Sequence, residues 1–418
     1  MAMTKKKVFY GWWIVAGGFI LNFIGIGIGI NAIGVFFKPV VESLGFSRGD
    51  FSLYFTIAAL SMTFAAPVVG KLMEKFDVRL IMGFSTMLLA ASFALYSQCT
   101  TLLHFYLLSI LVGIAHGGSH IIPVSTMISN WFKKKRGLAM GIVFSATGLG
   151  GLLFNPLSNW LILEYGWRQT YILLGIIIGV VCIPTAVFLM RISPEQVGLN
   201  PDGVERQDAP EKEAISAGLT LGEFIKTGAF WFLAFMVMFI NVINMGIQQH
   251  LIPYLTDLKH SSTFAANIMG LYLGMTVVGK LTLGHISDTR GLAKGLILFL
   301  AILVVGILTL FDARLALFAI LFAVIYGIGN AVQTIMPPLM TSECSGLKHF
   351  ALIYGIISIF STLGSAVGMP LSGYLYDWQG NYDAAFVLYI ALAIVAAALG
   401  VCALRSAPFK RIQPIRYT

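Results

Sequence analysis

The stretch LIMGFSTMLLAASFALYSQCTTLLHFYLLSILVGIAHGGSHIIPVSTMISNWF, residues 80–132, contains no Lys, Arg, Asp or Glu. A helix needs roughly 20 apolar residues to cross a hydrocarbon core about 30 Å thick, so this run is long enough for two crossings. Polar residues gather near its middle, at Ser97, Gln98, Thr100 and Thr101. The pattern predicts two membrane-spanning helices joined by a tight turn.

Similar charge-free runs recur on both sides of this stretch. Of the 418 residues, 58% are hydrophobic and only 11% are charged, whereas a water-facing globule of this size needs a largely polar surface. The excess apolar surface requires a lipid bilayer. We therefore expect about twelve spans, at 10–37, 49–70, 79–98, 101–125, 136–160, 168–190, 229–252, 263–285, 293–311, 314–340, 349–373 and 382–404.

The basic residues predict how the chain crosses the membrane, because positively charged loops stay cytoplasmic. If the N-terminus is cytoplasmic, most of the 27 Lys and Arg residues fall in inner segments, and both termini lie inside. Only Lys38, Arg48, Arg168, Lys259 and Arg314 fall in outer segments. The formal net charge of +9 then reflects topology, so we expect no nucleic-acid partner.

Signatures of enzymes are missing from the sequence. It has no Walker-type nucleotide loop, no HExxH and no CxxC pair. The four cysteines are scattered and lack metal-ligand spacing. We expect a protein that is not an enzyme, with no cofactor and no metal site.

The two halves of the chain repeat one pattern with a shift of 214 residues. Gly150 matches Gly364, Gly166 matches Gly380, and the tripeptide Pro-Leu-Ser at 156–158 recurs at 370–372. Between the halves lies an acidic, proline-containing segment. We expect six helices in 1–190, a cytoplasmic linker in 191–226 and six helices in 227–418.

Two predicted cytoplasmic loops resemble the signature of the major facilitator superfamily, a Gly followed four residues later by an acid and then by basic residues. One is GKLMEK at 70–75 and the other GHISDTRG at 284–291. The resemblance implies an all-α membrane protein with twelve transmembrane helices in two pseudo-symmetric six-helix bundles. It also implies a cytoplasmic gate, which we assign to Glu74, Arg136, Asp288 and Arg290.

A longer motif is similar to one in monocarboxylate transporters. NWFKKKRGLAMG at 130–141 resembles the run that leads into their fifth helix, and YGWW at 10–13 with VFFK at 35–38 resembles their first helix. This resemblance covers essentially the whole chain. It implies proton-coupled symport of a small monocarboxylate such as lactate or pyruvate by alternating access. The partners would be a small organic anion and a proton, and the protein would be a multi-pass monomer in the cell membrane.

Lys280 is the only basic residue that we expect inside a span. A cation at the centre of a membrane costs about 3 kcal/mol on insertion scales, so it is normally kept where it faces a cavity or a partner. In the monocarboxylate transporters that this chain resembles, the equivalent helix carries an Arg that binds the substrate carboxylate. Lys offers a point charge in place of a planar fork. We predict that Lys280 binds the anion and helps to couple one proton to it; snorkelling towards Asp288 is the alternative.

Other polar residues at membrane depth predict a small cavity between the halves. Those assigned to substrate binding together with Lys280 are Asn31, Ser145, Thr276, Tyr326, Asn330, Tyr354 and Ser358. No Asp or Glu lies within a predicted span, so proton transfer requires other groups. We predict His250 and Asp257, with Lys280, as proton-coupling residues, and we interpret His116 and His120 as packing or hydrogen-bonding residues.

Three other functions fit the same layout. An anion exchanger of the oxalate/formate type resembles this chain in the eighth span, although such carriers have a second cation in the eleventh, where 354–358 has none. Efflux of apolar amines usually needs a membrane acid. A non-transporting sensor on the same fold would have the same sequence features. Measuring flux in proteoliposomes would distinguish a transporter from such a sensor.

Overall fold

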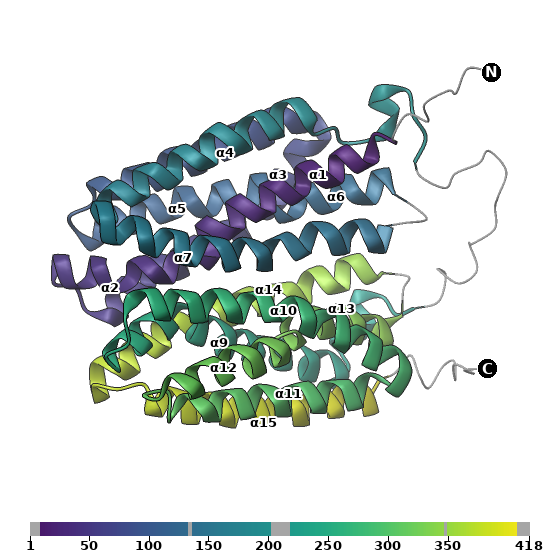
Figure 1. Cartoon of the computed structure of the whole chain (residues 1–418). Helices are drawn as coiled ribbons and strands as arrows, with labels where there is room; N and C mark the ends of the chain where they lie inside the picture. The colour runs from purple at the N-terminus through teal and green to yellow at the C-terminus, as the bar shows by residue number, and fades with distance from the viewer. Residues whose placement is uncertain (1–8, 133–135, 202–217, 347–348, 408–418) are drawn as a thin grey trace, which may run out of the picture. The chain divides into compact units, whose positions relative to one another are not determined.

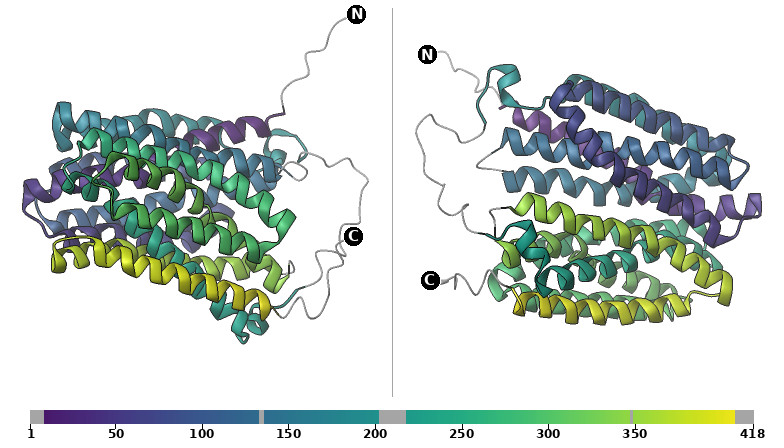
Figure 2. Two further views of the ribbon diagram at one scale, coloured as in Figure 1. Left: turned by 60° about the horizontal axis from the view of Figure 1, so that its bottom comes forward. Right: turned by 180° about the vertical axis from the view of Figure 1, so that it is seen from behind.

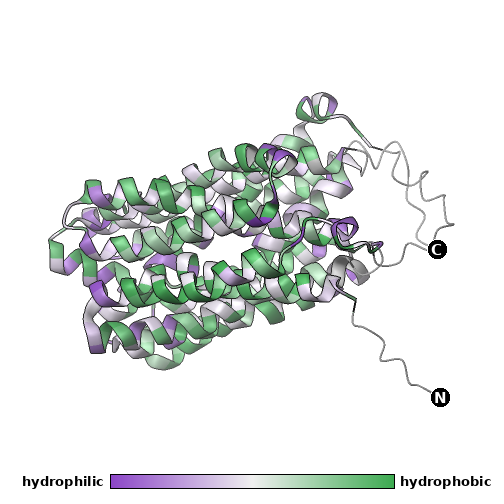
Figure 3. Cartoon of the chain, turned by 90° about the horizontal axis from the view of Figure 1, so that it is seen from above, coloured by the Kyte–Doolittle hydropathy of each residue, from purple (hydrophilic) through white to green (hydrophobic). Residues whose placement is uncertain are grey.

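The computed structural model describes residues 9–132, 136–201, 218–346 and 349–407. Within these ranges the chain is mainly helical, and an isolated β-bridge joins Gly218 to Gly346. Eleven segments are long and apolar enough to cross a membrane, and hydrophobic residues run along their lengths (Figure 3). One of them, Ala139–Leu189, contains two of the predicted spans, which are separated at Gly166, where φ is 78°. The twelve predicted spans and the all-α fold class are confirmed.

Grouping by contacts divides the chain into two units. The first comprises Met1–Ala32, Ser61–Phe154 and Leu161–Asp208, and the second comprises Ile33–Leu60, Asn155–Trp160 and Ala209–Thr418. This grouping differs from the division predicted at 190 and 227 in two short segments, 33–60 and 155–160, which pack with the C-terminal residues. Of the predicted linker, residues 202–217 lie outside the described part.

In the first unit, α4 packs along α5, and α1 packs against α6 and η4 (Figure 1). Two of its helices begin at polar caps: Asp77 accepts from the Arg79 backbone N–H, and Thr101 accepts from that of His104. Such caps satisfy backbone donors that the helix itself leaves free. The elements are α1 (Gly11–Leu21), η1 (Asn22–Asn31), the later part of α3 (Arg48–Lys75), α4 (Val78–Leu95), η2 (Tyr96–Gln98), α5 (Leu102–Ser119), α6 (Ile121–Trp131), α7 (Arg136–Ile177, except 155–160), η3 (Ile178–Cys182), η4 (Thr185–Leu189) and η5 (Pro194–Val197).

In the second unit, α9 is the central helix and packs against α14, α15 and α2, while α12 packs against α10 and α11. The run of α15 beside α11 can be followed in Figures 1 and 2. Thr227 and Ser261 cap the starts of α9 and α10. The elements are α2 (Ile33–Leu44), the start of α3, α8 (Leu221–Ile225), α9 (Gly228–Asp257), α10 (Ser262–Arg290), α11 (Leu292–Leu310), α12 (Ala316–Gly329), α13 (Val332–Ser345), α14 (Phe350–Gln379) and α15 (Asp383–Arg405).

The 214-residue repeat has a structural counterpart in each unit. A Cβ on Gly150 would strike the carbonyl oxygen of Phe23, and a Cβ on Gly364 would strike that of Met238. Only glycine therefore permits these two close helix contacts. Gly166 and Gly380 both have positive φ, 78° and 71°, a conformation that glycine adopts without strain. Matched positions thus perform matched roles.

Candidate functional site

Lys280 lies in α10, inside the apolar segment Ser262–Ser287, and its side chain is half-buried. Beside it in the chain, Gly279 packs directly against the backbone of Ile328 in α12. Among the residues that the structure describes, no ion pair or hydrogen bond engages the Lys280 ammonium. An intramembrane cation without such a partner is a candidate ligand-binding group.

A buried hydrogen-bond network lies on the same helix, two turns before Lys280. The Asn244 amide donates to the Tyr272 hydroxyl over 3.1 Å and to the Asn330 side-chain oxygen over 2.7 Å. The Asn330 amide also donates to Tyr272, over 3.0 Å. Residues 272, 276 and 280 are four apart, so Tyr272, Thr276 and Lys280 follow one another along one side of α10. The stripe therefore runs from Tyr272, a member of the network, to the cation.

The remaining predicted substrate residues are divided between the units. In the second unit, Tyr326 is fully buried against the Tyr272 ring, with centroids 5.3 Å apart. Ser358 donates to the Tyr354 carbonyl one turn earlier in α14. In the first unit, the Asn31 amide donates to the Thr147 carbonyl over 2.8 Å, and Ser145 donates to that of Ile142. Thr276 likewise donates to the Leu273 carbonyl. The structure brings Asn330 and Tyr326 together around Tyr272.

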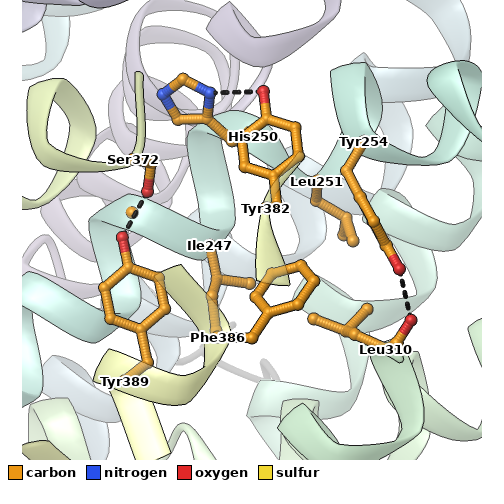
Figure 4. Close-up of a pocket in the computed structure, with 10 residues that line it drawn as sticks. Ile247, His250, Leu251, Tyr254, Leu310, Ser372, Tyr382, Phe386 and Tyr389 are labelled. Carbon is orange, nitrogen blue, oxygen red and sulfur yellow. Dashed lines mark hydrogen bonds between the residues drawn. The ribbon is translucent and has the colours of Figure 1, made fainter. Parts of the chain in front are cut away.

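His250 has hydrogen-bond partners at both ring nitrogens. Nδ1 lies 3.0 Å from the Tyr382 hydroxyl, and Nε2 lies 3.0 Å from the Met369 carbonyl oxygen. Since the carbonyl only accepts, Nε2 carries the hydrogen and Nδ1 accepts from Tyr382. The ring lines a small cavity of about 10 Å³ beside Tyr382 and Tyr389 (Figure 4). This neutral, bonded imidazole is held firmly in one orientation.

Asp257 is the centre of an ion cluster. Its carboxylate lies 2.7 Å from an Arg48 guanidinium nitrogen and 3.0 Å from the Lys38 ammonium. Arg48 also donates to the Tyr382 hydroxyl over 2.7 Å and stacks over the Tyr376 ring at 3.8 Å. The cluster, which we call the outer ion cluster (Lys38, Arg48 and Asp257), ties α2 and the start of α3 to the end of α9.

A second carboxylate holds the start of α3. Asp377, near the end of α14, accepts from the backbone N–H groups of Arg48 and Gly49 over 3.2 and 2.7 Å. A carboxylate at a helix N-terminus satisfies free backbone donors and complements the helix dipole. The start of α3 is therefore fixed through both its side chain and its backbone.

The predicted cytoplasmic gate is described only in part. The side chains of Glu74, Arg136 and Asp288 lie outside the described part of the chain, and Arg290 is exposed at the end of α10. Nearby, Arg79 forms a salt bridge of 2.6 Å with Asp77. The hydrogen bond from Arg79 keeps the pKa of that carboxyl below its usual range.

Sequence reasoning missed three residues that the structure makes prominent, Arg48, Tyr272 and Tyr382. The sequence placed Arg48 in an outer segment and gave it no further role, because its partner Asp257 lies more than 200 residues away in the chain. Tyr272 had a usable signal, the four-residue spacing to Thr276 and Lys280. Tyr382 had none, since an aromatic residue at a span boundary is common in any membrane helix.

Comparisons with known proteins agree with this architecture. The family model of the Major Facilitator Superfamily matches residues 16–260 and 234–416. Monocarboxylate transporter 13 of Bos taurus is 26% identical over 403 residues, covering 94% of this chain and 88% of that protein. The Escherichia coli protein named uncharacterized MFS-type transporter YhjX is 26% identical over 362 residues, covering 84% of this chain and 85% of its own.

Solved structures share the fold at low sequence identity. The nucleoside transporter NupG matches with a TM-score of 0.74 at 12% identity, covering 93% of this chain and 99% of that one. A bacterial homologue of the human lysosomal transporter Spinster matches with a TM-score of 0.67 at 16% identity, covering 96% of both chains. At these identities the likeness concerns the fold alone.

Proposed function

Because the chain belongs to the Major Facilitator Superfamily, whose relatives here are transporters and not enzymes, we propose that it carries a small monocarboxylate together with a proton. The reaction is symport by alternating access. The acid resembles lactate or pyruvate in size and charge. The relatives of this chain include monocarboxylate transporters 12 and 13.

The observation that carries this proposal is the ammonium of Lys280, which lies within an apolar segment and has no ion pair among the described residues. A cation at that depth costs about 3 kcal/mol on insertion scales, and a carboxylate that binds it offsets this cost. One cation matches one carboxylate, which favours a monocarboxylate over a dicarboxylate. Thr276 and Tyr272 supply polar groups along the same helix, and Asn244 and Asn330 bond to Tyr272 from other segments.

The proton accompanies the anion for an electrostatic reason. Loading a carboxylate alone would bring a negative charge across the apolar core, whereas anion and proton together move no net charge. Lys280 binds the anion, and a second group takes up the proton. The two bound ions together then carry no net charge. For proton uptake the sequence offers His250 and Asp257, together with Lys280.

The proposal extends to location and topology. We infer a multi-pass monomer in the cell membrane, with both termini cytoplasmic and two six-helix halves, 1–190 and 227–418. The excess of basic residues in the predicted inner segments supports this orientation. Labelling of single cysteines introduced at Lys259 and at Lys294, with a reagent that does not cross membranes, tests it. Labelling from outside at 259 alone is expected, and labelling at 294 alone contradicts the orientation.

Uptake by proteoliposomes tests the function. Purified protein is reconstituted, an inward proton gradient is imposed, and uptake of labelled lactate, pyruvate, acetate and oxalate is measured. We expect gradient-driven accumulation of at least one monocarboxylate, loss of this uptake in Lys280→Gln, and wild-type uptake in Lys294→Gln, which removes an exposed cation of α11. Flux that requires an anion on the opposite side would favour an exchanger, and binding without flux a sensor.

A further inference from the structure

Two buried imidazoles lie next to each other in the first unit, away from every group used so far. His116 is 6% exposed and His120 is 1% exposed. Their ring centroids are 5.1 Å apart. Neither nitrogen of His116, nor Nε2 of His120, has a hydrogen bond of good geometry among the described residues, although the backbones of Gly29 and Leu21 approach the two rings. Buried polar atoms are normally paired, so three such atoms together require an explanation.

The backbone is irregular on both sides of the pair. Helix α5 ends at Ser119 and α6 begins at Ile121, because His120 itself is non-helical, with φ −122° and ψ −101°. Opposite lies η1, a ten-residue π-helical stretch. Short π-helical segments and interrupted membrane helices occur frequently at functional sites of transporters. Here the two irregular segments meet at the same place.

Glycines of η1 make the room that the rings occupy. A Cβ on Gly25 would overlap the His120 ring, and a Cβ on Gly29 would lie 2.6 Å from Nε2 of His116. Any other residue at either position would push an imidazole away. The first span and the interrupted helix therefore fit each other through these two rings.

The hydrogen bonds of Ser119 determine the tautomer of His120. The Ser119 hydroxyl donates its only hydrogen to the Ala115 carbonyl over 2.6 Å. Its oxygen also lies 2.6 Å from Nδ1 of His120, so Nδ1 carries a hydrogen and donates it. Nε2 of His120 then has a bare lone pair, which is the atom able to take up a proton.

No charge competes for this lone pair. The chain carries no Lys, Arg, Asp or Glu at 8–37, 80–132 or 137–163, which include η1, α5, α6 and most of α4. The polar side chains recorded against the His120 ring are the Ser119 hydroxyl and the His116 ring. Of the other titratable groups of α4 and α5, Arg79 lies at the start of α4 and is paired with Asp77. His104 and Tyr106 lie near the opposite end of α5, and Tyr96 and Cys99 precede that end.

We propose that the His116–His120 pair is the proton-binding site of the carrier, an inference that rests on the proton coupling proposed above. Nε2 of His120 takes up one proton from water and the ring becomes an imidazolium; release of that proton to the other side restores the neutral ring, and no other bond changes. The pair holds a single proton, because two like charges this close in apolar surroundings repel strongly.

The contrast with His250 supports this assignment. His250 already uses both ring nitrogens, and protonating Nδ1 would break its bond from Tyr382. Nε2 of His120 keeps its lone pair, and the Leu21 backbone can accept from the ring once it is protonated. The geometry of the pair thus suits reversible protonation, whereas that of His250 suits a fixed structural role.

Transport measurements test the site. In proteoliposomes, wild-type protein should accumulate the acid up to about tenfold across one pH unit, since one coupled proton supplies about 1.4 kcal/mol per unit. His116→Gln/His120→Gln should lose this accumulation but keep counterflow of labelled against unlabelled acid at equal pH. His104→Gln, an exposed histidine of the same helix, should behave as wild type. Full accumulation in the double variant would overturn the proposal, and loss in His250→Gln alone would assign the proton to His250.

A second measurement needs no substrate and therefore separates failure of this site from failure of the proposed function. The ¹⁵N signals of the imidazoles, assigned with the Gln variants, report protonation directly. Because burial in apolar surroundings disfavours the charged form of histidine, the titration is followed from about pH 8 to about pH 4, and the pair should take up one proton in total. A pair that stays neutral, or takes up two protons, would contradict the proposal whatever the transport result.

Discussion

Replacing Asp257 with Asn removes the only carboxylate of the outer ion cluster. Arg48 and Lys38 lie 2.7 and 3.0 Å from it, and the side chains of the three residues are 12–24% exposed. At an effective dielectric constant of about 20, each contact is worth about 6 kcal/mol before desolvation is subtracted. Because removing one member of a buried pair costs about 3–5 kcal/mol and this carboxylate is partly exposed, we expect Asp257→Asn to cost about 2–3 kcal/mol.

A double-mutant cycle isolates the pair. Free energies of unfolding are measured in mixed detergent micelles for Asp257→Asn, Arg48→Gln and the double variant. We expect a coupling energy of about 2 kcal/mol, within the range for residues in contact. As a matched control, Glu42→Gln removes a 64% exposed carboxylate 3.8 Å from Lys38 and should change stability by less than about 0.5 kcal/mol. Additivity of the two single changes would refute the reasoning.

Three further predictions concern stability. Gly364→Ala should destabilise the protein by about 1–3 kcal/mol because its Cβ would meet a backbone carbonyl that cannot move aside. Gly70→Ala, at a position with open space, should leave the stability unchanged. Equal free energies of unfolding for the two variants would contradict this prediction. Tyr272→Phe should cost about 1–3 kcal/mol, because it removes the acceptor of one hydrogen bond from each of two buried amides, Asn244 and Asn330. Tyr326→Phe, whose hydroxyl has no recorded partner in the described residues, should be nearly neutral, and the reverse order would contradict the network. The pKa of Asp77 is lowered in the folded state, so the ionised carboxylate stabilises the protein above its unfolded pKa of about 3.9, and this contribution is lost as the pH falls. Asp77→Asn should therefore flatten the dependence of the unfolding free energy on pH below about pH 4. An unchanged pH dependence would contradict this prediction.

The spans and the repeat were predictable because they depend on local and periodic features. Charge-free runs of sufficient length identify membrane helices without reference to partners. The shift of 214 residues identified Gly150 and Gly364 before their shared role against a neighbouring backbone was known. Here sequence pattern and structural role coincide.

The sites were less predictable because their members are distant in the chain. Lys38 and Arg48 looked like separate outer charges and Asp257 like a proton-coupling residue, and only folding brings the two cations to 3.0 and 2.7 Å from the Asp257 carboxylate. His116 and His120 looked like packing residues. The break at His120 and the π-helical stretch opposite it have no signature in apolar periodicity, so their meeting could not be anticipated.

Direct binding of a labelled monocarboxylate to the purified protein tests the central claim, that Lys280 holds the anion. Equilibrium binding is measured for wild type, Lys280→Gln and Lys294→Gln under identical conditions. We predict saturable binding in the wild type and in Lys294→Gln, and a loss of at least about tenfold in Lys280→Gln, the equivalent of one charge-assisted hydrogen bond of about 1.5–3 kcal/mol. Unchanged affinity in Lys280→Gln would contradict the account.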